Sequence, residues 1–325
     1  MNLKKVVFST LSIGALLIIG FLAGPRVVVE TQLSNAPLPA DLDRFLTQTE
    51  ARYPDITPGA EKTIVWAHPD RRKTALAVVY LHGFSASRQE TAPLSDEIAR
   101  QLGANLYYPR LSGHGRSGAA MAEASVNAWL NDTEQALQIG QRLGERVIVI
   151  ATSTGATLAT WLATQPHSDK VLAYALISPN FAPKDSAAQV LTWPWAEHFV
   201  PLLLGAEHQW QPRNAEQARY WNHRYPVQAL LPMMGLVQYV QGLPLENIQT
   251  PLLVIYSPQD KVVSPTATEQ AFARFGSTPK QLLALADTQD DSHHVLAGRI
   301  LSPRDTPRVE AAILQFLKPL LSAQP

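Results

Sequence analysis

The chain has 325 residues, enough for one large domain with a sizeable core or for two small domains. Its 27 lysines and arginines balance 27 aspartates and glutamates, and no basic stripe is interleaved with aromatic residues, so no nucleic-acid partner is expected. Cysteine is absent, which excludes disulfides, thiolate metal sites and cysteine nucleophiles.

An uncharged apolar stretch of 19 residues, Val6 to Gly24, follows Lys4 and Lys5. As a helix it would extend about 28 Å, close to the thickness of the hydrocarbon core of a bilayer. Residues 1–24 are therefore predicted to form an uncleaved signal anchor, a transmembrane helix that places the catalytic domain on the exported, periplasmic side of the inner membrane. A cleaved signal that releases a secreted protein is the alternative, although Pro25 follows the cleavage point. A buried core helix is a third interpretation.

The segment after the anchor is predicted to be irregular and then helical. Residues 25–40 are expected to form a linker, because Pro37 and Pro39 interrupt any regular element. Helical spacing of apolar residues then predicts a helix over Asp41 to Arg52. The composition of Thr63 to Ala67 indicates a strand.

From residue 75 onward, apolar strands alternate with helices. Ala75–Leu81 is apolar along its whole length, as expected of a central strand buried on both faces. The other predicted strands are Ala104–Tyr108, Arg146–Ala151, Val171–Ile177, Pro251–Tyr256 and Lys280–Leu285, and the predicted helices are Leu94–Leu102, Val126–Leu143, Ala156–Thr164 and Pro307–Leu321. This alternation predicts an α/β fold over residues 41–325, with a mostly parallel central sheet and helices on both faces.

The alternation fails between Asn180 and Thr250, where helical patches occur without a convincing strand. An insertion of this size between two strands is typical of a lid or a small subdomain, so a helical cap is predicted at about residues 181–250. Its tryptophans are Trp193, Trp195, Trp210 and Trp221. Most of them are expected to pack the insertion onto the sheet, and some are expected to line a cavity.

A turn of small residues, with Ser153 at its centre, follows the strand that ends at Ala151. A tight strand-to-helix reversal needs small side chains two positions before and two positions after the serine, and Ala151 and Gly155 meet that need. The pattern is a variant of G-x-S-x-G in which alanine takes the first position. Such a turn presents the serine at the C-terminal edge of the sheet. The alternative is a Ser/Thr-rich helix N-cap.

Attack by a serine on an acyl carbon requires a base, a group that orients the base, and donors for the oxyanion. Asp260 follows a predicted strand and is the candidate orienting group, although it could also be a turn former beside Pro258. His294 lies in the loop after the last predicted strand and is the candidate base, with the adjacent His293 as the alternative. The order Ser, Asp, His is the one expected for this architecture.

The oxyanion donors are expected near the end of an earlier strand. His82-Gly83-Phe84 follows the strand Ala75–Leu81, and Gly83 allows the backbone to turn closely. The backbone N–H of Phe84 is one candidate donor, and the N–H of Thr154 is the second. An ordinary glycine between strand and loop is the alternative.

These motifs resemble those of the α/β-hydrolases, in particular the branch of monoacylglycerol lipases and bacterial carboxylesterases. The matching pieces are His82-Gly83-Phe84, Leu111–Ser117, Thr152–Gly155, Ser257–Asp260 and Ser292–Val295. The resemblance implies that Ser153 is the nucleophile, that Asp260 orients the base, and that His294 is base and then acid. It favours His294 over His293, because family members place the histidine before an apolar residue.

Two features depart from the family pattern. Ala151 replaces the commoner glycine, and it fits if the local backbone avoids positive φ. Asp290 and Asp291 lie close to the base in sequence, so either could orient it in place of Asp260. His114 lies in a family loop with a structural role and is not assigned to catalysis.

The resemblance implies a serine hydrolase that cleaves a small-molecule or lipid ester through an acyl-enzyme, without a metal or organic cofactor. One alternative is a peptidase, amidase or thioesterase on the same triad. Glu90 would then bind an amine, although a solvated first-turn glutamate is the favoured interpretation. A non-catalytic, membrane-tethered binding protein is the second alternative. The motifs specify neither acyl-chain length nor oligomeric state.

Overall fold

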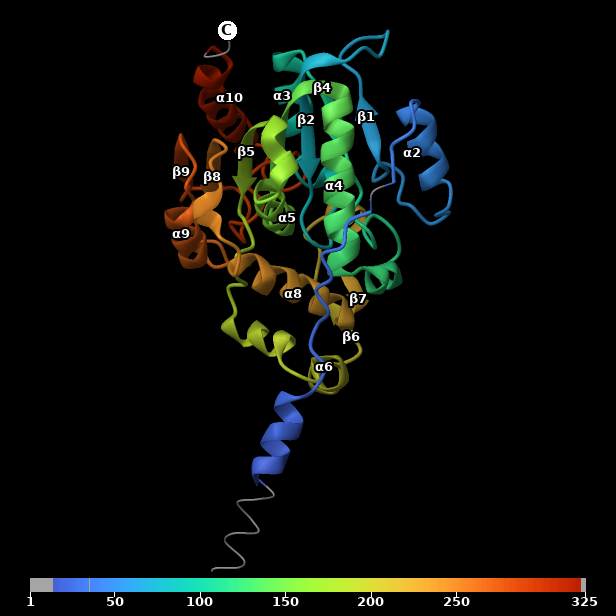
Figure 1. Ribbon diagram of the computed structural model, residues 1–325, viewed down its shortest axis with the longest axis vertical. Coiled ribbons are helices and arrows are strands. Elements are labelled where there is room, and N and C mark those ends of the chain that lie inside the picture. The colour runs from blue at the N-terminus through green and yellow to red at the C-terminus, as the bar shows by residue number, and fades with distance from the viewer. Residues whose placement is uncertain (1–13, 35, 323–325) are drawn as a thin grey trace, which may run out of the picture.

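A seven-stranded sheet lies at the centre of the chain, of which the computed structural model describes residues 14–34 and 36–322. Its strands are β1 (Thr63–Val65), β2 (Thr74–Leu81), β3 (Asn105–Tyr108), β4 (Gly144–Thr152), β5 (Val171–Ile177), β8 (Leu252–Tyr256) and β9 (Lys280–Ala284). Their order is β1-β3-β2-β4-β5-β8-β9, and all neighbours are parallel except β1 and β3. The predicted α/β fold with a mostly parallel sheet is confirmed (Figure 1).

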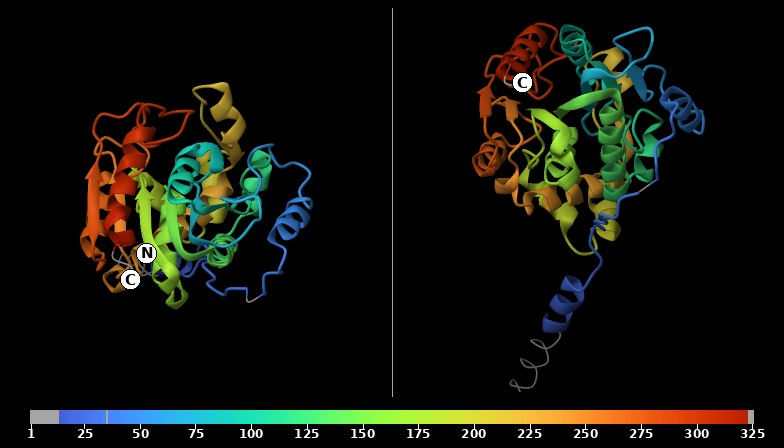
Figure 2. Two further views of the ribbon diagram at one scale, coloured as in Figure 1. Left: turned by 90° about the horizontal axis from the view of Figure 1, so that it is seen from above. Right: turned by 45° about the horizontal axis from the view of Figure 1, so that its top comes forward.

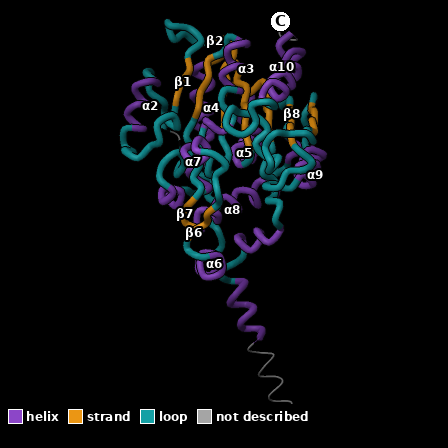
Figure 3. The backbone as a smooth tube through the Cα atoms, turned by 180° about the vertical axis from the view of Figure 1, so that it is seen from behind, coloured by secondary structure: helices purple, strands orange, loops and turns teal. Residues whose placement is uncertain are grey.

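Helices cover both faces of this sheet. The helices are α2 (Leu42–Glu50), α3 (Leu94–Leu102), α4 (Val126–Leu143), α5 (Thr154–Ala163), α6 (Ala196–Leu204), α7 (Ala215–Tyr220), α8 (Leu230–Gln241), α9 (Pro265–Arg274) and α10 (Thr306–Ser322). Side chains of α4 and α5 pack on one face, and those of α3 and α10 pack on the other (Figures 1 and 3). Along β2, Ala77 and Val79 join the first layer, whereas Val78 and Tyr80 join the second. Burial of both faces explains why the central strands are apolar without interruption.

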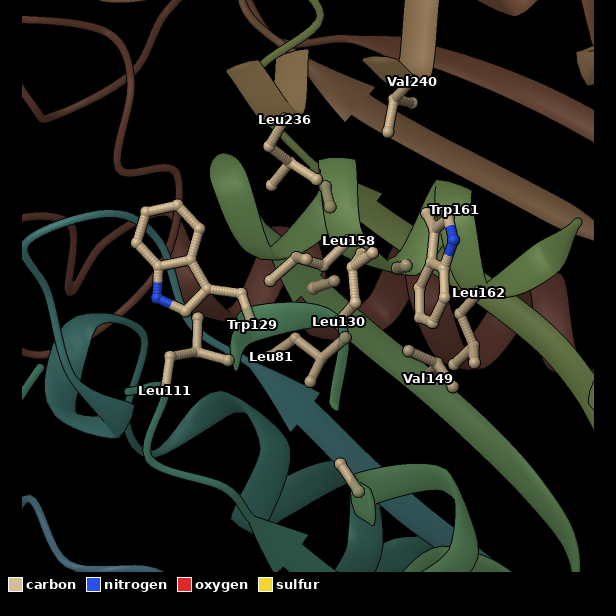
Figure 4. Close-up of a cluster of buried hydrophobic side chains, with 14 of the residues drawn as sticks. Leu81, Leu111, Trp129, Leu130, Val149, Leu158, Trp161, Leu162, Leu236 and Val240 are labelled. Carbon is tan, nitrogen blue, oxygen red and sulfur yellow. The ribbon is translucent and has the colours of Figure 1, made fainter. Parts of the chain in front are cut away.

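The core under α4 and α5 contains the largest buried side chains. Trp129 of α4 and Trp161 of α5 are fully buried, and they share one cluster with Leu81 and Val149 of the sheet (Figure 4). Interiors of this kind are packed about as densely as organic crystals. The packing therefore holds α5 rigidly against the ends of β2 and β4.

The register between neighbouring strands brings their C-terminal ends level. Leu81 of β2 pairs with Ala151 of β4, and Thr152 of β4 pairs with Ile177 of β5. The segments that follow these three strands consequently emerge side by side at one edge of the sheet. Ligand sites of open α/β sheets lie at this edge.

The insertion between β5 and β8 forms a cap at the same edge (Figure 1). It contains α6, α7 and α8, together with a two-stranded antiparallel sheet of β6 (Glu207–Gln209) and β7 (Arg224–Pro226). The sequence analysis expected helices alone. The strand β6 was not predicted, because its three residues are polar and exposed and lack the alternation of apolar and polar residues that indicates a half-buried strand.

Residues 14–22 form a helix that stands off the body of the molecule (Figure 2) and lies beyond α6 in Figures 1 and 3. Within the described part of the chain, we find no helix with both the length and the apolar character needed to cross a bilayer. The predicted anchor, residues 1–24, begins outside the described residues, and it remains a prediction.

The first half of the predicted linker follows a defined path over the body. Asn127 of α4 donates from Nδ2 to the carbonyl of Gln32 at 2.8 Å, and Arg26 donates from Nη1 to the carbonyl of Thr192 at 3.2 Å. Apolar linker side chains, including Val27, pack against the core. This part of the linker is therefore docked on α4 and on the cap.

Candidate active site

Ser153 occupies the turn between β4 and α5 with φ 52° and ψ −118°. A non-glycine residue rarely adopts positive φ, and it does so only where the surroundings enforce it. Here the Ser153 N–H donates to the carbonyl of Ile177 at 2.9 Å, and the Asn180 N–H donates to the carbonyl of Ser153 at 3.1 Å. Ala151 lies outside the positive-φ region, so alanine fits where the family commonly has glycine.

The backbone of α5 passes so close to β2 that residue 155 has no room for a side chain. A Cβ at Gly155 would lie 2.2 Å from the carbonyl oxygen of Leu81. We expect Gly155→Ala to lower the free energy of unfolding by about 1–3 kcal/mol through overpacking, and to reduce activity by shifting Ser153. Urea denaturation of the variant checks this. Gly242→Ala is the control without the clash, because Gly242 has φ −82° and an added Cβ would come no closer than 3.4 Å to another atom; it should leave the free energy of unfolding nearly unchanged.

The structure brings Ser153, His294 and Asp260 into one hydrogen-bonded chain. Ser153 Oγ lies 3.0 Å from His294 Nε2, and His294 Nδ1 lies 2.8 Å from Asp260 Oδ2. All three side chains are buried. The other carboxylate oxygen of Asp260 accepts the N–H groups of Val262 and Val263 at 2.7 and 2.9 Å. Asp260 is thus fixed in place, and it can orient the imidazole so that Nε2 accepts the serine proton.

The alternatives for the base and for its orienting group lie elsewhere. His293 has φ 55°, and its Nδ1 lies 2.7 Å from Thr288 Oγ1. Asp291 is exposed and forms a salt bridge with Arg213 at 3.2 Å. Asp290 is buried, but its Oδ2 accepts the backbone N–H of His294 at 3.0 Å. Of the three candidate carboxylates, Asp260, Asp290 and Asp291, only Asp260 contacts the imidazole of His294.

Asp290 organises the loop that carries His294, a role that the sequence analysis missed. Its Oδ2 also accepts the N–H of Val295 at 3.0 Å, and its Oδ1 accepts from Arg213 Nη1 at 2.7 Å. Burial alone would raise the pKa of Asp290, but the bonds from Ser292, Val295 and His294, with the charge of Arg213, lower it below its usual range. Since Arg213 belongs to the cap, this carboxylate links the cap directly to the base.

The pKa of His294 is raised above the ordinary histidine value. Burial lowers it, but the carboxylates of Asp260, Glu90 and Asp290 favour the imidazolium more strongly. A histidine must be neutral to accept the serine proton, so kcat/KM should rise with pH to a plateau, with a midpoint above about 6.5. A pH–rate profile for a soluble ester checks this expectation. A midpoint below the ordinary value would contradict it.

The two candidate oxyanion residues, Phe84 and Thr154, line the same cavity as Ser153. A Cβ at Gly83 would lie 3.2 Å from Ser153 Cβ, which shows how closely the loop with Phe84 approaches the serine. Thr154 begins α5, so its N–H lies at the positive end of a helix. Neither of these two N–H groups is hydrogen bonded within the described residues. Both can therefore donate to a ligand.

Glu90 is buried, and the favoured expectation of a solvated glutamate is wrong. Its Oε2 accepts from the Gly83 N–H at 2.8 Å and from the Tyr80 hydroxyl at 2.9 Å. Burial raises the pKa of Glu90, and these hydrogen bonds offset the rise in part. Glu90 thus holds the peptide between His82 and Gly83, one residue before Phe84. A tyrosine inside the apolar strand at position 80, which needs a buried polar partner, is the signal that could have indicated this.

A cavity of about 460 Å³ lies over Ser153, between the sheet edge and the cap. Its apolar wall comes mainly from the cap and includes Trp210, Trp221, Tyr225, Leu230 and Met233. Two of the four cap tryptophans therefore line a cavity, as expected of some of them. The other two, Trp193 and Trp195, are exposed and do not pack onto the sheet as expected of most.

A family model described as Hydrolase_4, serine aminopeptidase, S33, matches residues 72–289. A protein named thermostable monoacylglycerol lipase, from Bacillus sp. (strain H-257), is 24% identical over 220 residues, which are 68% of this chain and 83% of that protein. The matched family segment contains Ser153 and Asp260 and ends shortly before His294.

Solved structures share the fold. A structure from work on two metagenome-derived lipolytic enzymes, LipS and LipT, has a TM-score of 0.64 at 24% identity, covering 81% of this chain and 99% of that one. A soluble variant of monoglyceride lipase from Saccharomyces cerevisiae, in complex with a substrate analogue, has a TM-score of 0.61 at 14% identity, covering 80% and 91%.

Proposed function

The chain belongs to the serine aminopeptidase S33 family of α/β-hydrolases, and on that basis we propose that it cleaves carboxylic esters with Ser153, His294 and Asp260 as its triad. The observation that supports this most directly is the hydrogen-bonded chain from Ser153 Oγ through His294 to Asp260, at the floor of a largely apolar cavity. Such a cavity accommodates the acyl or alcohol portion of an ester.

In the proposed reaction, Ser153 Oγ attacks the ester carbonyl while His294 Nε2 takes its proton. The N–H groups of Phe84 and Thr154 stabilise the oxyanion. His294 then protonates the departing alkoxide, which leaves as an alcohol and yields an acyl-enzyme. Water attacks this ester with His294 again as base, and His294 then returns the proton to Ser153 Oγ as the carboxylic acid is released. Asp260 keeps the imidazole in the required orientation and stabilises the imidazolium.

The two carboxylates of the cavity wall bear on whether the substrate is an ester or carries a free amine. Binding of a substrate amine would require a free anionic group. Glu90 is instead buried and bonded through its Oε2 to Tyr80 and to the Gly83 N–H, which leaves only its Oε1 without a hydrogen bond in the described residues, and Asp290 is paired with Arg213. Within the described residues, these are the acidic side chains that line the cavity. This occupation favours esters, and the lipolytic relatives support the same choice.

A substrate panel tests the proposed activity. p-Nitrophenyl esters from acetate to laurate are assayed beside aminoacyl p-nitroanilides. We expect ester hydrolysis, with the preferred acyl chain set by the cavity. Hydrolysis of the anilides without the esters would instead favour an aminopeptidase. Turnover of neither, together with no labelling by a fluorophosphonate, would favour a binding protein.

We also propose that residues 1–24 anchor the protein in the inner membrane, with the hydrolase domain on the periplasmic side. The proposal is supported by the 19 uncharged residues after Lys4 and Lys5. Membrane fractionation followed by N-terminal sequencing tests it. Recovery of a soluble protein that begins near residue 25 would replace the anchor with a cleaved signal.

A further inference from the structure

The exposed apolar side chains of the cap gather at its outer end. Leu202, Leu203 and Leu204 are consecutive residues at the end of α6, with exposed fractions of 85%, 68% and 54%. Trp193 and Trp195, just before α6, are also exposed. Single exposed apolar residues are common, but a contiguous group of this kind marks an interaction site.

The same end of the cap meets the helix over residues 14–22. The ring of Phe21 packs edge-on against Trp193, with ring centroids 6.4 Å apart. Trp195 donates from Nε1 to the carbonyl of Gly20 at 3.2 Å, and from its backbone to the carbonyl of Pro25 at 2.7 Å. Figures 1 and 3 show α6 at the end of this helix that is nearest the body. We call the surface formed by residues 14–22, Trp193, Trp195 and Leu202–Leu204 the apolar end.

The apolar end is held at a fixed angle to the body. The docked linker, with its bonds from Asn127 to Gln32 and from Arg26 to Thr192, joins the helix to both α4 and the cap. Exposed apolar side chains of the helix and of the cap therefore lie at the same end of the molecule. Leu16, Leu17, Ile18 and Ile19 of the helix are each exposed by more than 60%.

The chemistry of this surface favours lipid over protein. The helix belongs to the uncharged stretch that continues back to Val6, and no charged residue occurs between Pro201 and Ala206 of the cap. Tryptophan is enriched where a protein crosses the interface between lipid and water. Beside the apolar end, a cleft contains the cations Arg26 and Lys184 and the single anion Asp185, a balance that suits phosphate-bearing headgroups.

We propose that the apolar end docks on a lipid bilayer, with Leu202–Leu204 inserted among the acyl chains and the cap held against the headgroups. This contact is additional to the anchor, and it places the cavity next to the surface from which a lipid ester would enter. That benefit rests on the proposed function. The contact itself does not depend on hydrolysis, and it can be tested without it.

A single introduced cysteine measures the contact, because the chain has none of its own. Full-length Leu203→Cys is labelled with a nitroxide and reconstituted in phosphatidylcholine vesicles. Electron paramagnetic resonance then compares collisions with oxygen, which concentrates in lipid, and with a water-soluble nickel complex. Val65→Cys is the matched control, since Val65 is exposed on β1, far from α6 (Figures 1 and 3). We expect oxygen to dominate at position 203 and nickel at position 65.

Two results would overturn the proposal. One is a label at position 203 that stays as accessible to nickel as the control. The other is shielding from both reagents that grows with protein concentration, which would indicate a second copy of the chain as the occupant. Neither readout requires catalysis, so an inactive protein would contradict the proposed function without affecting this test.

The double variant Leu202→Ser, Leu203→Ser provides a functional check. Hydrolysis of an ester carried in vesicles should fall about tenfold, because less apolar area is available to insert. Hydrolysis of soluble p-nitrophenyl butyrate should stay unchanged, since α6 does not line the catalytic cavity. Equal rates for the variant and the parent on the vesicle substrate would count against the lipid contact.

Discussion

Replacing Ser153 with alanine is expected to lower kcat for esters by about 10⁴-fold or more, because no other group takes over nucleophilic attack. The variant should also lose all labelling by a fluorophosphonate, which reacts with an activated serine. Steady-state kinetics on p-nitrophenyl butyrate and in-gel fluorescence measure the two effects. The substitution removes one oxygen from a side chain at the cavity floor, so the fold should be retained.

Ser85→Ala is the matched control for this loss. Ser85 lines the same cavity and also has positive φ, but it contacts neither His294 nor Asp260. The control should keep full labelling and an activity within a few fold of the parent. If Ser153→Ala were labelled as strongly as the control, the nucleophile would have to be another residue.

Replacing Asp260 with asparagine is expected to lower kcat by about 10⁴-fold, the loss seen when the orienting carboxylate of such a triad becomes an amide. An amide can donate to His294 Nδ1, and the imidazole then carries its proton on Nε2, where it must accept. The variant should also titrate His294 at lower pH, because the carboxylate of Asp260 is the strongest of the charges that raise its pKa. A pH–rate profile measures both changes.

Asp290→Asn separates orientation of the imidazole from support of its loop. Asp290 lies in the loop that carries His294 and is as deeply buried as Asp260. It contacts backbone N–H groups and Arg213, and it does not contact the imidazole. Its replacement should reduce kcat far less than Asp260→Asn, and should reduce the free energy of unfolding by about 1–3 kcal/mol. A larger loss of kcat in Asp290→Asn than in Asp260→Asn would reverse the two assignments.

The sheet and the positions of the triad could be predicted from the sequence because both depend on local patterns. Uninterrupted apolar runs indicate strands buried on both faces, and parallel strands bring their C-terminal ends to one edge. Ser153 and Asp260 each follow such a strand, and His294 follows the parallel edge strand β9, so their order along the chain was enough to predict that they meet.

The residues that support the triad depend on contacts between distant segments. Arg213 and Asp290 are 77 positions apart, and neither has a motif that points to the other. Glu90 looks like an ordinary residue of a first helical turn until the fold buries it against Tyr80. The cap was predicted because the alternation of strands and helices stops between residues 180 and 250. That pattern gives the extent and composition of the cap, but not the direction in which its side chains face.

The hydrogen bonds of Asn180 fix where the cap can be replaced without moving Ser153. This first residue of the insertion is fastened to the nucleophile turn by its N–H to Ser153 and by its carbonyl, which accepts from Thr157 Oγ1 at 2.7 Å. Ala182 and Lys184 in turn hydrogen bond to the segment after Asp260, so the cap can be exchanged after position 184 while the serine and the carboxylate keep their geometry. A transplanted cap must still supply one cation where Arg213 lies, since Asp290 would otherwise remain buried and unpaired next to the base. The cap beyond this boundary can thus set the substrate range, whereas catalysis still depends on the ion pair between Arg213 and Asp290.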